Sequence, residues 1–128
     1  MDILLLGDNQ HRISFFQNGL KQNKLTVCRH ARAAIKALKQ KQFDVIFLDH
    51  DLDEDTDPDN ENSGSEVARF IADHGVECGN IILHSENRVG RESMESILDK
   101  CQVLPYGKLK QTGLRNILKL VDRKEDKA

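Results

Sequence analysis

The sequence contains few of the residues that mark special classes of protein. It has no tryptophan, one tyrosine, two prolines and three cysteines. The cysteines, Cys28, Cys78 and Cys101, are odd in number and are never spaced as Cys-x-x-Cys. This pattern argues against a disulfide framework and against a zinc knuckle. We therefore expect three reduced thiols that pack as small apolar side chains.

Excess charge and long apolar runs are also missing. Nineteen basic residues stand against 21 acidic residues, which gives a formal net charge of −2 at pH 7. No electrostatic argument therefore favours binding to duplex nucleic acid or to a membrane surface. No apolar run approaches the roughly 18 residues of a membrane span, and the apolar start of the chain lacks the basic segment of a signal peptide. We predict a cytoplasmic protein.

Short apolar runs alternate with helical patterns along the chain. Continuous apolar runs of this length are typical of strands buried on both faces of a parallel sheet. The pattern predicts one α/β domain over residues 1–121, followed by a charged tail over residues 122–128. We expect a doubly wound, five-stranded parallel sheet of the receiver or flavodoxin type with strand order 2-1-3-4-5. Its strands are expected at residues 3–6, 25–28, 45–48, 81–83 and 103–104, with five helices after them.

The stretch between the third strand and the third helix is acidic and polar. Residues Asp53 to Glu61 contain Pro58 and no apolar side chain, so they predict a solvated loop. The spacing does not match an EF-hand calcium loop, which requires glycine at its sixth position and glutamate at its twelfth. Ser63 and Glu66 follow with the spacing of a capping box, which predicts a helix start.

Ionisable residues follow three of the expected strands. Asp8 ends the first strand, residues 49–51 (Asp-His-Asp) end the third, and His84 and Ser85 end the fourth. In an open parallel sheet, ligands bind beyond the carboxyl ends of the strands, where the strand order reverses. For the expected order that point lies between the first and third strands. The sequence therefore predicts a ligand site at this edge of the sheet.

Phosphate chemistry with a metal ion suits the carboxylates at these strand ends. Asp8, Asp49 and Asp51 are the candidate ligands for Mg²⁺ or Mn²⁺, because both cations prefer hard oxygen donors. Such a cation polarises a phosphoryl oxygen or lowers the pKa of a bound water. Asp51 is also a candidate catalytic residue.

The remaining candidates would handle protons and phosphate oxygens. His50 and His84 are candidate general acids or bases. Ser85, Asn87 and Arg91 are candidate phosphate-binding residues, since they surround the expected start of the fourth helix, where backbone N–H groups favour anions.

Each candidate also has a purely structural interpretation. Asp8 could cap the first helix. His50 points away from Asp49 if the strand stays extended, which leaves it packed or solvated. His84 could be a packed core residue, and Arg91 a surface residue. The sequence alone leaves these alternatives open.

Residues 3–9, 43–52 and 81–85 resemble the receiver domains of response regulators. The resemblance implies a metal-binding role for Asp8 and phosphorylation of Asp49, with Ser85 as the hydroxyl that ends strand four. Receiver domains usually carry a second acid where this chain has Gly7.

These domains also carry a lysine before a proline after strand five. Lys108 is the candidate for that lysine, but Leu109 follows it instead of proline.

Two further motifs resemble a divergent family, the cyclic-phosphate processing receiver domains. Residues 48–52 read Leu-Asp-His-Asp-Leu, and residues 84–94 read His-Ser-x-Asn-x-x-Gly-Arg-x-x-Met. Gly64 stands where that family has a glycine before its third helix. The family usually has Asp-Asp and then an arginine two residues on, whereas here Arg12 lies further from Asp8. The resemblance implies a receiver fold and activity on cyclic nucleotide or cyclic phosphate groups.

Three functions remain open at this point. The chain could be a metal-assisted phosphoesterase that acts on cyclic phosphates. It could instead be a receiver phosphorylated on Asp49 in signal transduction, which is a switch and not an enzyme. It could also be a pseudo-receiver that binds a protein or a nucleotide without chemistry. The expected partner is a small phosphate-containing ligand or a signalling protein, and the sequence does not determine the oligomeric state.

Overall fold

The structure is a computed structural model in which residues 1–52 and 62–126 are described. The acidic stretch from Asp53 to Glu61, interpreted above as a solvated loop, lies outside the described residues. No helix in the described part of the chain has the length and apolar character of a membrane span.

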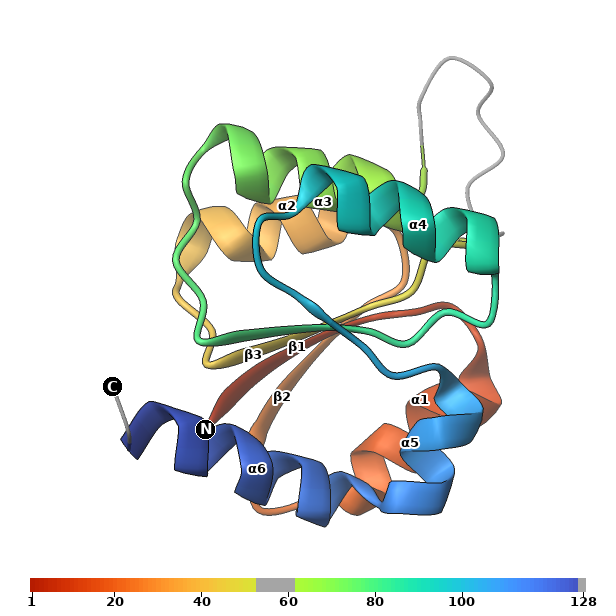
Figure 1. Ribbon diagram of the computed structural model, residues 1–128, viewed down its shortest axis with the longest axis vertical. Helices are drawn as coiled ribbons and strands as arrows, with labels where there is room; N and C mark the ends of the chain where they lie inside the picture. Colours follow the sequence, from red (N-terminus) through yellow and green to blue (C-terminus); the bar gives the residue numbers. More distant parts are fainter. Residues whose placement is uncertain (53–61, 127–128) are drawn as a thin grey trace.

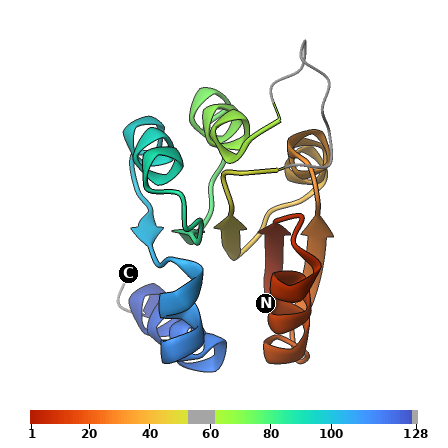
Figure 2. The same ribbon diagram turned by 90° about the vertical axis from the view of Figure 1, so that its right-hand side faces the viewer.

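A five-stranded parallel sheet lies at the centre of the molecule, and its strand order, β2-β1-β3-β4-β5, confirms the prediction (Figure 2). Leu6 of β1 pairs with Cys28 of β2 and with Leu48 of β3, and Leu48 pairs with Leu83 of β4. The carboxyl ends of these four strands are therefore level, so the residues that follow them share one edge of the sheet. The strands are β1 (Asp2–Leu6), β2 (Lys24–Cys28), β3 (Val45–Leu48), β4 (Asn80–Leu83) and β5 (Gln102–Val103).

Helices cover both faces of the sheet (Figure 1). One layer consists of α2 (Ala31–Gln40), α3 (Gly64–Asp73) and α4 (Arg88–Ile97). The other layer consists of α1 (Gln10–Gly19), α5 (Tyr106–Thr112) and α6 (Leu114–Asp126).

The last helical segment differs from the expectation of a single helix. Gly113, with a φ of 85°, separates α5 from α6, because a positive φ ends a right-handed helix and is readily adopted only by glycine. The described residues thus contain six helices instead of five. Helix α6 continues to Asp126 and includes the first residues of the expected tail.

The sheet separates two hydrophobic cores because successive side chains of a strand point to opposite faces. Ile46 and Leu48 of β3 pack with the α2–α4 layer, whereas Val45 and Phe47 pack with the α1–α6 layer. All residues of β3 and β4 are buried. Continuous apolar runs therefore identified these strands correctly.

Helix α3 begins very close to the end of β3. A Cβ on Gly64 would lie 2.1 Å from the backbone oxygen of Asp49, so only glycine permits this approach. Ser63 is the N-cap residue, as its spacing predicted. The predicted capping box is wrong in detail, because the Ser63 side chain makes no capping hydrogen bond. Its backbone oxygen accepts the N–H of Glu66 instead.

Candidate functional site

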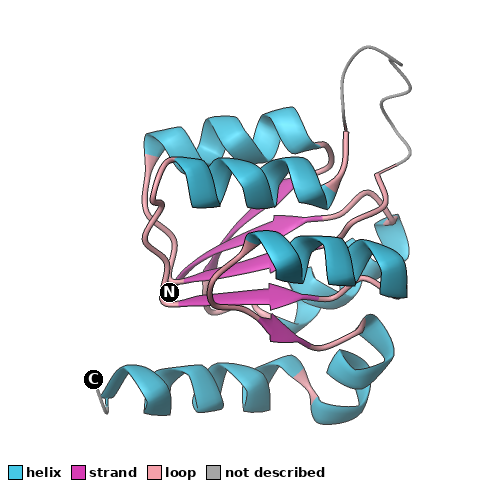
Figure 3. Ribbon diagram, turned by 45° about the horizontal axis from the view of Figure 1, so that its top comes forward, coloured by secondary structure: helices cyan, strands magenta, loops and turns pink. Residues whose placement is uncertain are grey.

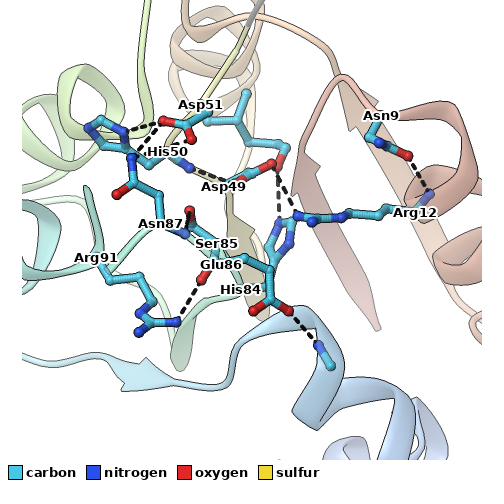
Figure 4. A network of polar contacts seen from close by, with 12 residues as sticks. Asn9, Arg12, Asp49, His50, Asp51, His84, Ser85, Glu86, Asn87 and Arg91 are labelled. Carbon is cyan, nitrogen blue, oxygen red and sulfur yellow. Dashed lines mark hydrogen bonds and ion pairs between the residues drawn. The ribbon is translucent and has the colours of Figure 1, made fainter. Parts of the chain in front are cut away.

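A pocket of about 160 Å³ lies at the carboxyl ends of β1, β3 and β4, and we call it the carboxyl-end pocket (Figure 4). It lies at the edge of the sheet where the strand order reverses between β1 and β3, as the sequence predicted. Four of its lining residues are acids. The lining residues are Asp8, Asn9, Arg12, Asp49, Asp51, Ser85, Glu86 and Asn87.

Asp49 is the most deeply buried acid of the pocket, with 5% of its surface exposed. Its carboxylate accepts a 2.9 Å hydrogen bond from the backbone N–H of His50 and lies 3.8 Å from the guanidinium of Arg12. Burial raises the pKa of Asp49, although the charge of Arg12 and hydrogen bonds from the His50 backbone and the Ser85 side chain oppose the increase. Asp49 is thus a buried carboxylate with incomplete compensation of its charge.

Arg12 was not among the site residues predicted from the sequence. It lies in the first turn of α1, where the side chain of Asn9 caps the helix by accepting the N–H of Arg12. The guanidinium extends back over the sheet edge and stacks 4.7 Å from the centre of the Tyr106 ring. The capping signal at Asn9 could have located Arg12, because the third residue after a cap lies in the first turn. The alternative that Asp8 caps this helix is wrong.

Asp51 lies at the rim of the carboxyl-end pocket, with 57% of its side chain exposed. One of its oxygens contacts Nδ1 of His50 at 2.9 Å, and Asn87 donates to the same carboxylate at 3.0 Å. The hydrogen bond with His50 is the main reason that the pKa of Asp51 is lowered, and Asn87 adds to the effect. These three side chains form one polar network at the rim (Figure 4).

His50 points away from Arg12 and towards α4, as alternation along an extended strand predicts (Figure 4). A Cβ on Gly90 would lie 2.3 Å from Cγ of His50, so the ring packs directly on the backbone of the first turn of α4. The side chain of His50 keeps 22% of its surface exposed. His50 contacts the pocket through Asp51 and does not line it.

His84 lies in the core and does not line the pocket. It is 1% exposed, and its ring makes edge contacts with Phe16 and Phe47. Nε2 donates a 3.1 Å hydrogen bond to the backbone oxygen of Leu6, while Nδ1 has no partner among the described residues. Burial lowers the pKa of His84 to about 4, so the ring is neutral at pH 7. His84 connects the end of β4 to the end of β1, just before Asp8.

The three candidate phosphate ligands occupy different places. Ser85 is buried and its hydroxyl accepts the N–H of Asn87 at 3.0 Å. Asn87 caps α4 by accepting the N–H of Gly90 at 3.2 Å. Arg91 donates to the backbone oxygen of Ser85 at 3.0 Å and is not part of the pocket lining. Ser85 and Asn87 therefore line the pocket, whereas Arg91 binds the backbone of the loop that follows β4.

Glu86, like Asn9 and Arg12, lines the pocket and was not selected by the sequence analysis. Its carboxylate accepts the N–H of Gly107 at 2.7 Å, which ties the loop after β4 to the start of α5. Nothing in the local sequence predicted this contact, because it joins segments 21 residues apart.

Lys108 does not occupy the position of a lysine at the end of strand five. It is exposed in α5, whereas Pro105 is the second residue after the end of β5. The residue before that proline is Leu104, which packs against the core on the α1 side. The residue before the proline that follows β5 is therefore leucine and not lysine.

The carboxylates of the pocket suit a hydrated divalent cation. Asp8, Asp49 and Asp51 all line the pocket and supply hard oxygen donors. Within residues 1–52 and 62–126, no three His, Cys, Asp or Glu side chains already lie at metal-binding separation. The buried charge of Asp49 favours any cation placed beside it.

This fold and this pocket define a receiver-like domain. The domain of the response regulator TrrA from Thermotoga maritima, solved with Mg²⁺ and BeF, is similar over 94% of this chain and 99% of that chain, with 19% identity and a TM-score of 0.68. The N-terminal domain of a response regulator/sensory box/GGDEF protein from Carboxydothermus hydrogenoformans matches over 98% and 97%, with 18% identity and a TM-score of 0.72. A CheY-like receiver from Methanospirillum hungatei matches over 98% and 97%, with 14% identity and a TM-score of 0.68. At these identities, the comparisons establish the fold.

The family is more specific than the fold. The model of the cyclic-phosphate processing receiver domain matches residues 3–100, so the chain belongs to this family. A comparison with curated proteins yields no match.

Proposed function

We propose that the carboxyl-end pocket binds the phosphate group of a cyclic nucleotide, or of another cyclic phosphate ester, and that the domain hydrolyses the ring ester. The observation that carries the proposal is the Arg12–Asp49 pair, in which a cation lies 3.8 Å from a buried carboxylate on the pocket wall. A cation attracts the phosphate oxygens, and a carboxylate beside it can hold and deprotonate a water. Membership of the cyclic-phosphate processing family supports the same substrate class.

The size of the pocket supports entry of a phosphate group alone. Its volume of about 160 Å³ is below the roughly 300–1,000 Å³ of pockets that enclose a whole small molecule. The phosphate would therefore enter, while the sugar and base of a nucleotide remain outside. Mg²⁺ or Mn²⁺ is part of the proposal, with Asp8, Asp49 and Asp51 as its ligands. When bound, it would polarise a phosphoryl oxygen.

The proposed reaction opens the ring by hydrolysis. A water attacks phosphorus, a new P–O bond forms, and one ring P–O ester bond breaks to leave a phosphomonoester. Asp49 accepts the proton of the water, a role that its raised pKa favours. His50, held at the rim by its contact with Asp51, delivers a proton to the leaving ester oxygen. Asp49 then gives its proton to solvent, and His50 takes one from solvent. His84 takes no proton in this scheme because it is buried and neutral.

A turnover screen tests the proposal. The protein is incubated with 2′,3′-cyclic and 3′,5′-cyclic nucleotides, cyclic dinucleotides and ADP-ribose cyclic phosphate, each with Mg²⁺, Mn²⁺ or EDTA. We expect metal-dependent ring opening that falls at least about 100-fold in Asp49→Asn and about 10-fold in Arg12→Gln. The matched control is Arg32→Gln, which removes the same charge from an exposed position on α2. Equal turnover in wild type, Asp49→Asn and Arg12→Gln would contradict the proposal.

A second candidate is a receiver that is phosphorylated on Asp49. The observation that favours it is the position of Asp49 at the end of β3 beside Ser85, in a fold shared with response regulators. The apolar Leu104 before Pro105 counts against it, because a receiver lysine is then missing. Intact mass after incubation with acetyl phosphate and Mg²⁺ separates the two functions: a phosphoryl adduct that Asp49→Asn abolishes, without turnover of cyclic phosphates, would favour the switch. If neither a phosphoryl adduct nor turnover is observed, the remaining interpretation is a domain that binds a ligand without chemistry.

A further inference from the structure

A second pocket lies away from the carboxyl-end pocket, near the amino ends of β1 and β2. It is lined by residues at the end of α1, in the segment that leads to β2, and on α6. In Figure 3 the last helix, α6, ends at the C-terminus on the side of the molecule where the N-terminus lies. Its volume is about 410 Å³, compared with about 160 Å³ for the carboxyl-end pocket. Lys21, Arg115 and Lys119 line it, and no Asp or Glu of the described chain does. We call it the cationic pocket.

Close helix packing builds the cationic pocket. A Cβ on Gly19, at the end of α1, would lie 2.8 Å from Cδ1 of Leu114, so glycine permits the start of α6 to approach α1 closely. Arg115 and Lys119 are four residues apart on α6 and therefore lie on the same side of that helix. Leu118, which packs partly against the core, adds an apolar part to the wall. Packing of α6 against the end of α1 thus brings Arg115 and Lys119 close to the segment that carries Lys21.

The three cations have no partner within the described residues. Lys21, Arg115 and Lys119 make no salt bridge and no hydrogen bond there, whereas Arg12, Lys41 and Arg88 each contact an acid. Like charges that line one pocket repel each other, and an anion placed between them removes that repulsion.

Neutral donors complete the lining. Asn18, Gln22 and Asn23 contribute side-chain amides to the same pocket. Phosphate oxygens accept hydrogen bonds from amides as well as from lysine and arginine. This set of groups is therefore suited to an anion with several oxygens and more than one charge.

We propose that the cationic pocket binds the polyphosphate group of a small molecule, either a nucleoside triphosphate or inorganic polyphosphate. Three cations suit a ligand with several negative charges, and a volume of about 410 Å³ falls in the range of pockets for small molecules. A nucleic acid backbone fits less well, because the chain carries a net charge of −2 and the cations lie in a pocket instead of along a stripe. This binding does not depend on the reaction proposed for the carboxyl-end pocket.

The test titrates the whole protein with inorganic triphosphate, ATP, adenosine and orthophosphate, and follows heat of binding and backbone amide NMR shifts. The test variant carries Lys21→Gln, Arg115→Gln and Lys119→Gln. A matched control carries Arg32→Gln, Lys36→Gln and Lys108→Gln, which removes the same three charges from other exposed positions. Asp49→Asn reports on the carboxyl-end pocket.

We expect saturable binding of inorganic triphosphate and of ATP, no binding of adenosine, and amide shifts centred on residues 18–23 and 115–119. The dissociation constant should rise at least about 30-fold in the triple test variant and change less than about 3-fold in the control variant and in Asp49→Asn. Tighter binding of ATP than of triphosphate would identify a nucleotide, and equal affinity would identify the polyphosphate group alone. Absence of saturable binding to the unmodified protein, or shifts confined to the carboxyl-end pocket, would overturn the proposal.

Discussion

Two buried polar side chains end neighbouring strands, and they have opposite surroundings. Asp49 follows β3 and His84 follows β4, and both are at most 5% exposed. Asp49 faces the pocket with Arg12, the His50 backbone and Ser85 around it. His84 lies between aromatic rings and contacts the backbone of β1. The comparison shows that burial alone does not make a strand-end residue part of the site: Asp49 lines the pocket beside a cation, whereas His84 is enclosed by the core.

The largest expected effect comes from the glycine that packs on the end of β3. Gly64→Ala should destabilise the fold by about 3 kcal/mol or more, because its Cβ would lie 2.1 Å from the backbone oxygen of Asp49 and the backbone must move. Gly7→Ala should cost less than about 1 kcal/mol, since its Cβ meets His84 at an ordinary 3.8 Å. Urea unfolding of both variants measures the difference. Equal stability of the two would show that the end of β3 adapts as easily as the end of β1.

Removing the ring of His84 should destabilise the protein more than removing the ring of His50, because His84 lies in the core and His50 at the rim of the pocket. His84→Ala should cost about 3 kcal/mol, because it deletes a fully buried ring and its hydrogen bond to Leu6. His50→Ala should cost less than about 1 kcal/mol, since that ring is partly exposed and its partner Asp51 is solvated. The free energy of unfolding in urea gives both values. A larger loss of stability in His50→Ala than in His84→Ala would contradict the core role of His84 and the rim role of His50.

Acid should weaken the fold through His84. Its pKa is about 4 in the folded protein and 6.5 in the unfolded chain, so the unfolded chain binds the proton first as the pH falls. The contribution of the neutral ring is fully present above pH 6.5 and is lost progressively between pH 6.5 and 4. A pKa that falls from 6.5 to about 4 on folding corresponds to about 3 kcal/mol of stability.

The variant His84→Phe isolates this contribution, because it keeps a ring that does not titrate. Its stability should vary less between pH 6.5 and 4 than that of the wild type, with Asp51 and other carboxylates contributing equally to both. Identical pH profiles, measured by thermal unfolding, would show that His84 does not titrate in this range.

The smallest expected effect is a gain in stability, whereas the preceding substitutions destabilise the fold. Asp49→Asn should raise Tm at pH 7 by a few degrees, because it removes a buried charge whose raised pKa records an unfavourable environment. The folded protein holds the Asp49 proton to a higher pH than the unfolded chain does, so the cost of this carboxylate appears as the pH rises through its folded pKa. The stabilisation should therefore fade at pH 3, where the wild-type carboxyl is also protonated. A lower Tm at pH 7 would mean that Arg12 more than compensates the charge.

Local signals predicted much of the fold and part of the site. The apolar runs of β1, β3 and β4 located strands that are buried on both faces, and their alternation with helices predicted a parallel sheet. The strand order was assumed from the receiver or flavodoxin type of sheet, and the structure has that order. The same order predicted where Asp8, Asp49 and Asp51 come together. These inferences succeeded because a strand that is buried on both faces needs an apolar side chain at nearly every position.

The directions of long side chains were not predictable in the same way. Arg12 reaches back from α1 to Asp49, Glu86 reaches α5, and Arg91 turns to the Ser85 backbone instead of the pocket. Each contact joins an element to a neighbour placed by the fold, so no local pattern encodes it.

The sequence by itself determined the strands and the acids at the ends of β1 and β3, since hydrophobic periodicity depends on residue type along the chain. Only the tertiary structure decided which polar groups meet. Leu48 pairs with Leu83, so the next residues, Asp49 and His84, lie side by side. Packing nevertheless encloses His84 among aromatic rings and leaves Asp49 facing the cation of Arg12. The free energy of a buried polar group depends on the atoms around it, and those atoms come from helices distant in the chain.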